Sequence, residues 1–176
     1  MLNIRQHGLE PPTRSVELEY CKVPRRRIKE VRKEIRSHDL GFTDEKLQMD
    51  AKEIIAVTSL AVSEGNFDSL VEYTDEGELA RLRKRYEELT PHERKFARMR
   101  AGEIAEVVWV ETFLNAEEEV TFGMRAFGYH WIGFRHFKAR NFFSAHYEIQ
   151  RPLCEASDRY RVISARHLHG YYNFLI

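Results

Sequence analysis

The sequence has only two cysteines, Cys21 and Cys154, and they lie far apart in no spacing that binds a metal or supports redox chemistry. We expect two free thiols in a reducing compartment, and one disulfide remains the alternative. An apolar run of the roughly 20 residues that a membrane-spanning helix needs is missing, so we do not expect the chain to cross a bilayer by itself. Residues 1–23 also lack the apolar stretch of a secretory signal and are not a clean mitochondrial presequence.

Patterns typical of catalysis are scarce as well. Neither a Walker loop nor a dinucleotide-binding glycine pattern occurs. Ser144 lies two residues before His146, but no glycine-flanked turn makes it a nucleophile elbow. We therefore expect no enzyme activity, no catalytic residue and no cofactor.

Two groupings of histidine remain as candidate metal ligands. His167 and His169 have the spacing that places two side chains on one face of a strand, but no carboxylate or cysteine lies close in sequence to complete a zinc site. His130, His136 and His146 lie on neighbouring hairpins, yet the sequence does not fix the register that would bring them together. The sequence therefore predicts no metal site.

The charges are unevenly distributed along the chain. The formal net charge is zero, but residues 1–40 carry +4, residues 41–121 carry −9 and residues 122–176 carry +5. Such a distribution predicts either faces of opposite sign that attract charged partners or charge spread over a solvated surface.

The most distinctive feature is a basic segment near the N-terminus. Pro11 and Pro12 resist regular structure, so we interpret residues 1–23 as a tail or linker. Residues 24–40 predict a basic amphipathic helix with a narrow apolar stripe. The stripe consists of Ile28, Val31 and Ile35, and the basic residues are Arg25, Arg26, Arg27, Lys29, Arg32, Lys33 and Arg36.

Three functions are open for this helix. It could dock on an anionic membrane surface with the apolar stripe dipping shallowly into the lipid. It could instead contact RNA phosphates, or it could be a solvated linker helix with internal ion pairs.

Helical periodicity and capping residues predict three further helices. One begins after the N-cap Thr43 and ends at Gly65. A second covers residues 77–89. A third begins after Thr90, with proline at its first position and Glu93 three residues after the cap, and runs to about Met99.

From Glu103 onward the pattern changes to β. Residues 104–114 are apolar on both faces, which predicts a well-covered strand. The second strand reaches residue 131, and its alternation changes parity around Gly128, which predicts a bulge or bend there.

Two more strands complete the predicted sheet. After a turn at residues 136–140, residues 143–150 alternate cleanly and Pro152 stops the strand. The last strand is expected from Tyr160 nearly to Tyr172. This order predicts an α+β fold in which the N-terminal helices pack on a strongly curved, four-stranded antiparallel sheet.

The chain is rich in aromatic residues, most of which we expect in the core. A few should line a concavity at the mouth of the curved sheet, where a ligand or peptide could bind. The residues predicted to line it are Trp109, Phe127, Tyr129, Trp131, Phe143 and Tyr147.

Several segments resemble one known family. These are residues 63–70, the helix with Leu79, Leu82 and Tyr86, the strand 107–113 and the stretch 142–151. Together they are similar to the Tim-forty-four-like domain family, which is named for the tether of the mitochondrial import motor, over roughly residues 42–170. The resemblance implies a cone-shaped sheet, as in nuclear transport factor two-like and cystatin-like folds, over residues 41–176.

The resemblance also implies a place and a set of partners. It implies a matrix protein without catalysis, peripheral to the mitochondrial inner membrane. The implied partners are the m-AAA protease and a newly imported inner-membrane client, with a subunit of the calcium uniporter as the implied case. Anionic inner-membrane lipid is a further expected partner. The alternative function is a mitochondrial ribosome-associated membrane anchor, whose expected partner is ribosomal RNA. A small-molecule-binding protein or enzyme of the cone fold remains the other alternative.

Overall fold

The structure is a computed structural model that describes residues 25–115, 118–134, 137–153 and 159–175. Within these ranges, the side chains of residues 25–27, 131–134, 137–141 and 168–175 are not described. The tail or linker predicted for residues 1–23, and both cysteines, lie outside the described residues.

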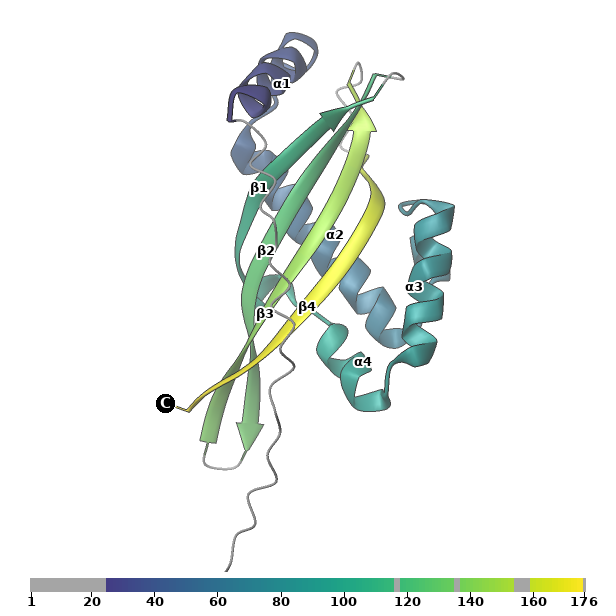
Figure 1. Ribbon diagram of the computed structural model, residues 1–176, viewed down its shortest axis with the longest axis vertical. Coiled ribbons are helices and arrows are strands. Elements are labelled where there is room, and N and C mark those ends of the chain that lie inside the picture. Colours follow the sequence, from purple (N-terminus) through teal and green to yellow (C-terminus); the bar gives the residue numbers. More distant parts are fainter. Residues whose placement is uncertain (1–24, 116–117, 135–136, 154–158, 176) are drawn as a thin grey trace, which may run out of the picture.

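Helices precede strands, as expected (Figure 1). The α-helices are α1 (Arg25–His38), α2 (Asp44–Glu64), α3 (Glu76–Glu88) and α4 (Pro91–Ala97), with 3-10 turns at Asp68–Leu70 and Ala101–Glu103. The strands β1 (Ile104–Leu114), β2 (Glu119–Phe134), β3 (Phe137–Pro152) and β4 (Arg161–Leu175) form one antiparallel sheet in the order β1-β2-β3-β4. The predicted α+β class is confirmed.

The long helix α2 begins and ends as its sequence predicts. The side chain of Thr43 accepts a hydrogen bond from the backbone N–H of Lys46 at 3.1 Å. Gly65 ends the helix with φ +71°, and a Cβ at this position would lie 2.9 Å from the ring of Tyr86. Glycine is therefore required here both by the left-handed backbone and by the packing.

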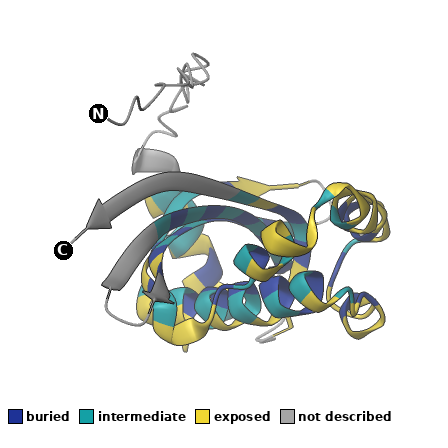
Figure 2. Cartoon of the chain, turned by 90° about the horizontal axis from the view of Figure 1, so that it is seen from below, coloured by how far each residue is buried: buried dark blue, intermediate teal, exposed yellow. Residues whose placement is uncertain are grey.

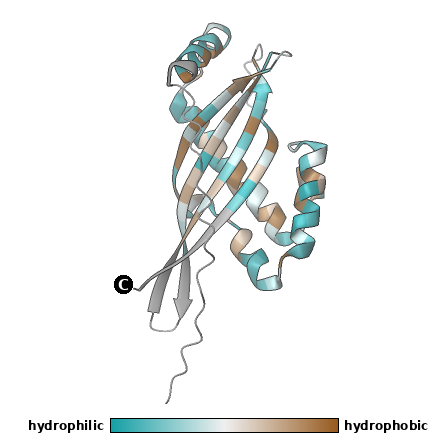
Figure 3. Ribbon diagram, in the orientation of Figure 1, coloured by the Kyte–Doolittle hydropathy of each residue, from teal (hydrophilic) through white to brown (hydrophobic). Residues whose placement is uncertain are grey.

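The helices cover one face of the sheet (Figure 2), and burial and hydropathy alternate along the two central strands (Figures 2 and 3). On β2 the even-numbered residues from Val120 to His130 are buried. On β3 the odd-numbered residues from Phe143 to Arg151 are buried, and the apolar ones belong to the same core as the buried residues of α2. The opposite face, called here the outer face, carries the intervening residues, most of which are half-buried.

Most of the apolar stripe of α1 packs into the protein. Ile35 is fully buried, Val31 packs against the same core, and Ile28 is half-buried. Ile35 and Val31 complete the core beside β1, which argues against the possibility that the stripe dips into lipid. Among the described helices, none is both long and apolar enough to cross a membrane.

A buried ion pair holds the end of α1 against the sheet. Arg151 on β3 is 2% exposed and donates to Asp39 Oδ2 at 3.0 Å. The guanidinium group also lies over the rings of Phe42 and Tyr160, at 5.4 and 5.9 Å from their centroids. Cation–π contacts of this kind help a desolvated arginine to remain charged in an apolar surrounding.

Strand β1 differs from its prediction. It is the first strand of the sheet and, among the described residues, pairs only with β2, so it is an edge strand rather than a well-covered one. Phe113 and Leu114 are each more than 40% exposed. The strand also contains two register shifts, between Ile104 and Glu106 and between Trp109 and Glu111. Irregularities of this kind are a common way to protect a free edge.

Two predicted interruptions of the sheet are also wrong. Strand β2 pairs with β3 without a break through Gly128, and its buried parity does not change there; the bulge lies opposite, on β1. A Cβ at Gly128 would collide with the backbone oxygen of Glu103 and the ring of Phe143, so glycine permits close packing rather than a bend. The turn expected at residues 136–140 is shorter, because β3 already begins at Phe137.

The ion pair between Asp39 and Arg151 gives a test of this architecture. Replacing Asp39 by alanine removes a carboxylate that pairs with a buried guanidinium, so we expect a loss of about 3 kcal/mol in the free energy of unfolding. Asp68→Ala is the matched control, because the carboxylate of Asp68 is 96% exposed in its pair with Arg83 and should change stability by less than about 0.5 kcal/mol. Urea unfolding measures both variants, and equal losses would contradict the assignment.

Candidate functional site: a cavity between α3, α4 and β4

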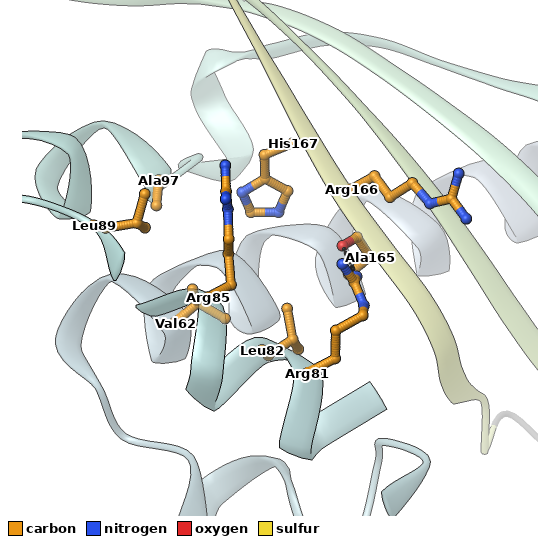
Figure 4. A pocket seen from close by; sticks show the side chains of 9 residues that line it. All are labelled: Val62, Arg81, Leu82, Arg85, Leu89, Ala97, Ala165, Arg166 and His167. Carbon is orange, nitrogen blue, oxygen red and sulfur yellow. Dashed lines mark hydrogen bonds between the residues drawn. The ribbon is translucent and has the colours of Figure 1, made fainter. Parts of the chain in front are cut away.

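A cavity of about 330 Å³ lies between the end of α2, the helices α3 and α4 and the strand β4 (Figure 4). Its apolar side is formed by Val62, Leu82, Leu89 and Ala97. Its polar side is formed by Arg81 and Arg85 of α3 and by residues 165–167 of β4. Apolar walls with a few polar groups are typical of sites that bind ligands or peptides.

Capping interactions fix the two helices that border the cavity. The side chain of Asp75 accepts hydrogen bonds from the backbone N–H groups of Gly77 and Glu78 at the start of α3. At the start of α4, Thr90 and Glu93 form the predicted capping box, which is confirmed. The hydrogen bonds from Thr90 lower the pKa of the Glu93 carboxyl, because they favour its charged form.

One buried carboxylate joins α3 to the edge of β4. Glu78 is almost fully buried and accepts two hydrogen bonds from Arg81, both at 2.6 Å, and one from the backbone N–H of Ala165 at 2.7 Å. Arg81 in turn donates to the backbone oxygen of Ala165 at 2.7 Å. The two side chains thus satisfy the N–H and C=O groups that a further strand would otherwise pair. The hydrogen bonds with Glu78 also raise the pKa of Arg81.

A second contact covers the same edge nearby. The backbone N–H of Val162 donates to the oxygen of Tyr73 at 2.6 Å, and the N–H of Asp75 donates to the oxygen of Val162 at 2.9 Å. The segment before α3 is therefore held beside β4 by backbone hydrogen bonds. Together with Glu78 and Arg81, these bonds fix the distance between α3 and the sheet, and so fix the shape of the cavity.

A tyrosine buried behind the cavity determines which ring nitrogen carries the proton in the histidine that borders the cavity. Tyr147 is fully buried, and its hydroxyl lies 2.6 Å from Nε2 of His167. Burial raises the pKa of Tyr147 far above its usual value, and the negative charge of Glu78 raises it further. The phenol therefore stays protonated and donates to Nε2, so a neutral His167 carries its proton on Nδ1.

The mouth of the cavity is cationic. Arg85 is two-thirds exposed, and its only described ion pair is with the exposed Glu88, at 3.0 Å. An ion pair between exposed side chains contributes little free energy, so a ligand carboxylate can compete with Glu88 for Arg85. Among the described lining residues there is no serine or cysteine nucleophile next to a base. The arrangement therefore favours binding of an apolar group that bears a negative charge.

The structure places the predicted basic residues in three different situations. The side chains of Lys29, Lys33 and Arg36 are exposed on α1. Arg32 instead pairs with Asp44 and lies over the ring of Trp109, 5.4 Å from its centroid. The side chains of Arg25, Arg26 and Arg27 lie outside the described residues.

The predicted aromatic concavity is not formed as a single site. Phe143 and Tyr147 are fully buried on the helix-covered face, whereas Phe127 and Tyr129 lie on the outer face. Their separation follows from the alternation of side chains along paired strands. Trp109 also lies on the helix-covered side, where it packs against Phe42 and Phe122 near α1. The side chain of Trp131 lies outside the described residues.

The grouping of His130, His136 and His146 also separates. His130 is buried on the helix-covered face, 3.4 Å from Glu103, and His146 lies on the outer face, so these two cannot share a metal. His136 and the side chain of His169 lie outside the part of the chain that is described. His167 borders the cavity.

Sequence reasoning missed Glu78, Arg81 and Arg85. The spacing of Glu78 and Arg81, three residues apart on a predicted helix, could have indicated an ion pair. It could not have indicated the contact with Ala165, because that contact joins residues 87 positions apart.

No protein-family model matches this chain. No curated protein matches it significantly either.

The raised pKa of Tyr147 predicts a pH effect of definite sign. Tyrosine in the unfolded chain loses its proton above about pH 10, whereas folded Tyr147 keeps it. This stabilising contribution is therefore fully present below pH 10 and is lost as the pH rises above it. Between pH 10 and 11.5 the free energy of unfolding of the native protein should fall by about 1.4 kcal/mol more per pH unit than that of Tyr147→Phe. Urea unfolding across this range measures the difference, and parallel curves would contradict the prediction.

Proposed function

We propose that this protein is a non-enzymatic adaptor or escort of the mitochondrial matrix, peripheral to the inner membrane. In this proposal it resembles the m-AAA protease-interacting protein, and it assists the import and assembly of newly imported inner-membrane subunits. The resemblance noted in the sequence supports the proposal. Its segment 142–151 lies on β3, an inner strand of the sheet.

The observation that carries the proposal is the way α1 presents its charges. The apolar stripe of α1 is used in packing, and the helix is held by the pairs Arg32–Asp44 and Arg151–Asp39. Lys29, Lys33 and Arg36 therefore project from a fixed helix toward solvent. A fixed set of exposed cations suits binding to an anionic membrane surface without insertion.

The cavity would serve the client in this proposal. An apolar segment of the client that carries a carboxylate would place its apolar part against Val62 and Leu82 and its charge beside Arg85. We also propose that the sheet has the strong, cone-like curvature of the family that the sequence resembles. Catalysis is not part of the proposed role.

Vesicle binding tests the membrane contact. We expect the protein to co-sediment with vesicles that contain cardiolipin, and binding should fall when salt is raised from about 0.1 to 1 M, because the Debye length drops from about 10 to 3 Å. Replacing both Lys29 and Lys33 by glutamine should weaken binding by about 2 kcal/mol, or roughly 30-fold.

The control for this experiment replaces Lys84 and Lys95 on α3 and α4, which should leave vesicle binding unchanged. Equal loss in the control would show that only total charge matters. Binding to ribosomal RNA at low salt, with no binding to vesicles, would favour the ribosome-associated alternative instead.

The cavity is tested with a peptide of alternating leucine and aspartate. Arg85→Gln should weaken its binding about tenfold, because a charge-assisted hydrogen bond contributes roughly 1.5 kcal/mol. Glu88→Gln should strengthen binding, because it removes the competing carboxylate. Arg83→Gln is the matched control on the same helix, since Arg83 pairs with Asp68 and does not border this cavity. Fluorescence anisotropy measures all three, and equal effects of the two arginine variants would overturn the assignment.

A further inference from the structure

Three side chains that commonly bind metals meet on the outer face of the sheet. Glu111 comes from β1, and His146 and Glu148 come from β3. One potential ligand atom of each lies within 4.8 Å of the other two. All three side chains are at least two-thirds buried, with exposures of 15% for His146, 22% for Glu111 and 30% for Glu148.

A glycine on the strand between them makes this meeting possible. Gly123 of β2 lies directly between Glu111 and Glu148 in the register of the sheet. A Cβ at Gly123 would lie 2.8 Å from Oε1 of Glu111, so the Glu111 side chain occupies the space that any other residue would fill. Glu111 can therefore reach across β2 toward His146 on β3.

The distances agree with the edges of a metal coordination polyhedron. Nε2 of His146 lies 3.2 Å from Oε1 of Glu111 and 3.7 Å from Oε1 of Glu148. Ligands about 2.1 Å from a tetrahedral zinc ion are separated from one another by roughly 3.4 Å. The distance from His146 to Glu148 is too long for a hydrogen bond. Both distances, however, are close to the separation expected between two ligands of one zinc ion.

We propose that Glu111, His146 and Glu148 form a binding site for a zinc ion, with water at the remaining position. The imidazole ligand favours zinc over magnesium and calcium, which prefer oxygen ligands alone. The two carboxylates balance the charge of the ion. The site does not involve α1 or the cavity, so the proposal is independent of the proposed function.

The residues around His146 limit the affinity of the site for zinc. Arg125 and Arg166 lie directly across from His146 on the neighbouring strands and oppose a cation. Within the described chain, Nδ1 of His146 is buried without a hydrogen-bond partner. A zinc site whose histidine is oriented by such a partner binds about 10- to 100-fold more tightly. The site should therefore bind zinc reversibly.

Zinc titration of the tag-free full chain, by calorimetry, tests the proposal. We expect one saturable site that raises the melting temperature, because the ion binds the folded state. His146→Gln should weaken binding at least tenfold, as should Glu148→Gln. Gly123→Ala should do the same with all three ligands still present, because its Cβ displaces Glu111. Arg125→Gln should tighten binding.

The controls separate this site from adventitious binding. Glu106→Gln removes an exposed carboxylate from the same strand and should leave the zinc affinity unchanged. Circular dichroism verifies that each variant is folded, and Glu148→Gln serves as the ligand variant if His146→Gln is not. The proposal is overturned if no saturable binding occurs, if folded ligand variants bind like the parent, or if millimolar magnesium displaces the zinc.

Discussion

The alternation of side chains across the sheet decides which chemical groups can meet in this protein. The helices cover only one face, so each strand residue is assigned either to the core or to the outer face by its position alone. Phe143 and Tyr147 join the core for this reason, whereas Phe127 and Tyr129 do not. The same constraint separates two histidines on neighbouring strands and brings one of them, His146, beside a carboxylate of its own strand and one from β1.

Two ion pairs, one buried and one with a half-exposed arginine, then attach the helices to this sheet. Arg151 holds the end of α1 through Asp39, and Glu78 with Arg81 holds α3 beside β4. Both pairs combine charge with further stabilising contacts, which offsets the cost of removing the ions from water. One pair orients the exposed lysines of α1 and the other shapes the cavity, so the two proposed binding surfaces are fixed by the same kind of interaction.

The sequence predicted local structure well where one residue has a specific backbone role. Thr43, Gly65 and the capping box at Thr90 placed helix boundaries to within one or two residues. It failed where the outcome depends on neighbouring strands. The apolar pattern of β1 indicated burial on both faces, but its position at the edge of the sheet leaves Phe113 exposed. The change in parity of the aromatic residues around Gly128 wrongly predicted a bulge or bend in β2. Phe143 of the next strand fills the core space beside Gly128 instead.

The covering of β4 by side chains has a consequence for the behaviour of the protein in a crowded solution. At Ala165 the backbone N–H and C=O groups are satisfied by the side chains of Glu78 and Arg81 rather than by another strand. Breaking this pair would uncover a pairing edge while most of the core remained intact. Self-association through an added strand would then compete with folding. The pair between Glu78 and Arg81 thus contributes to solubility as well as to the shape of the cavity.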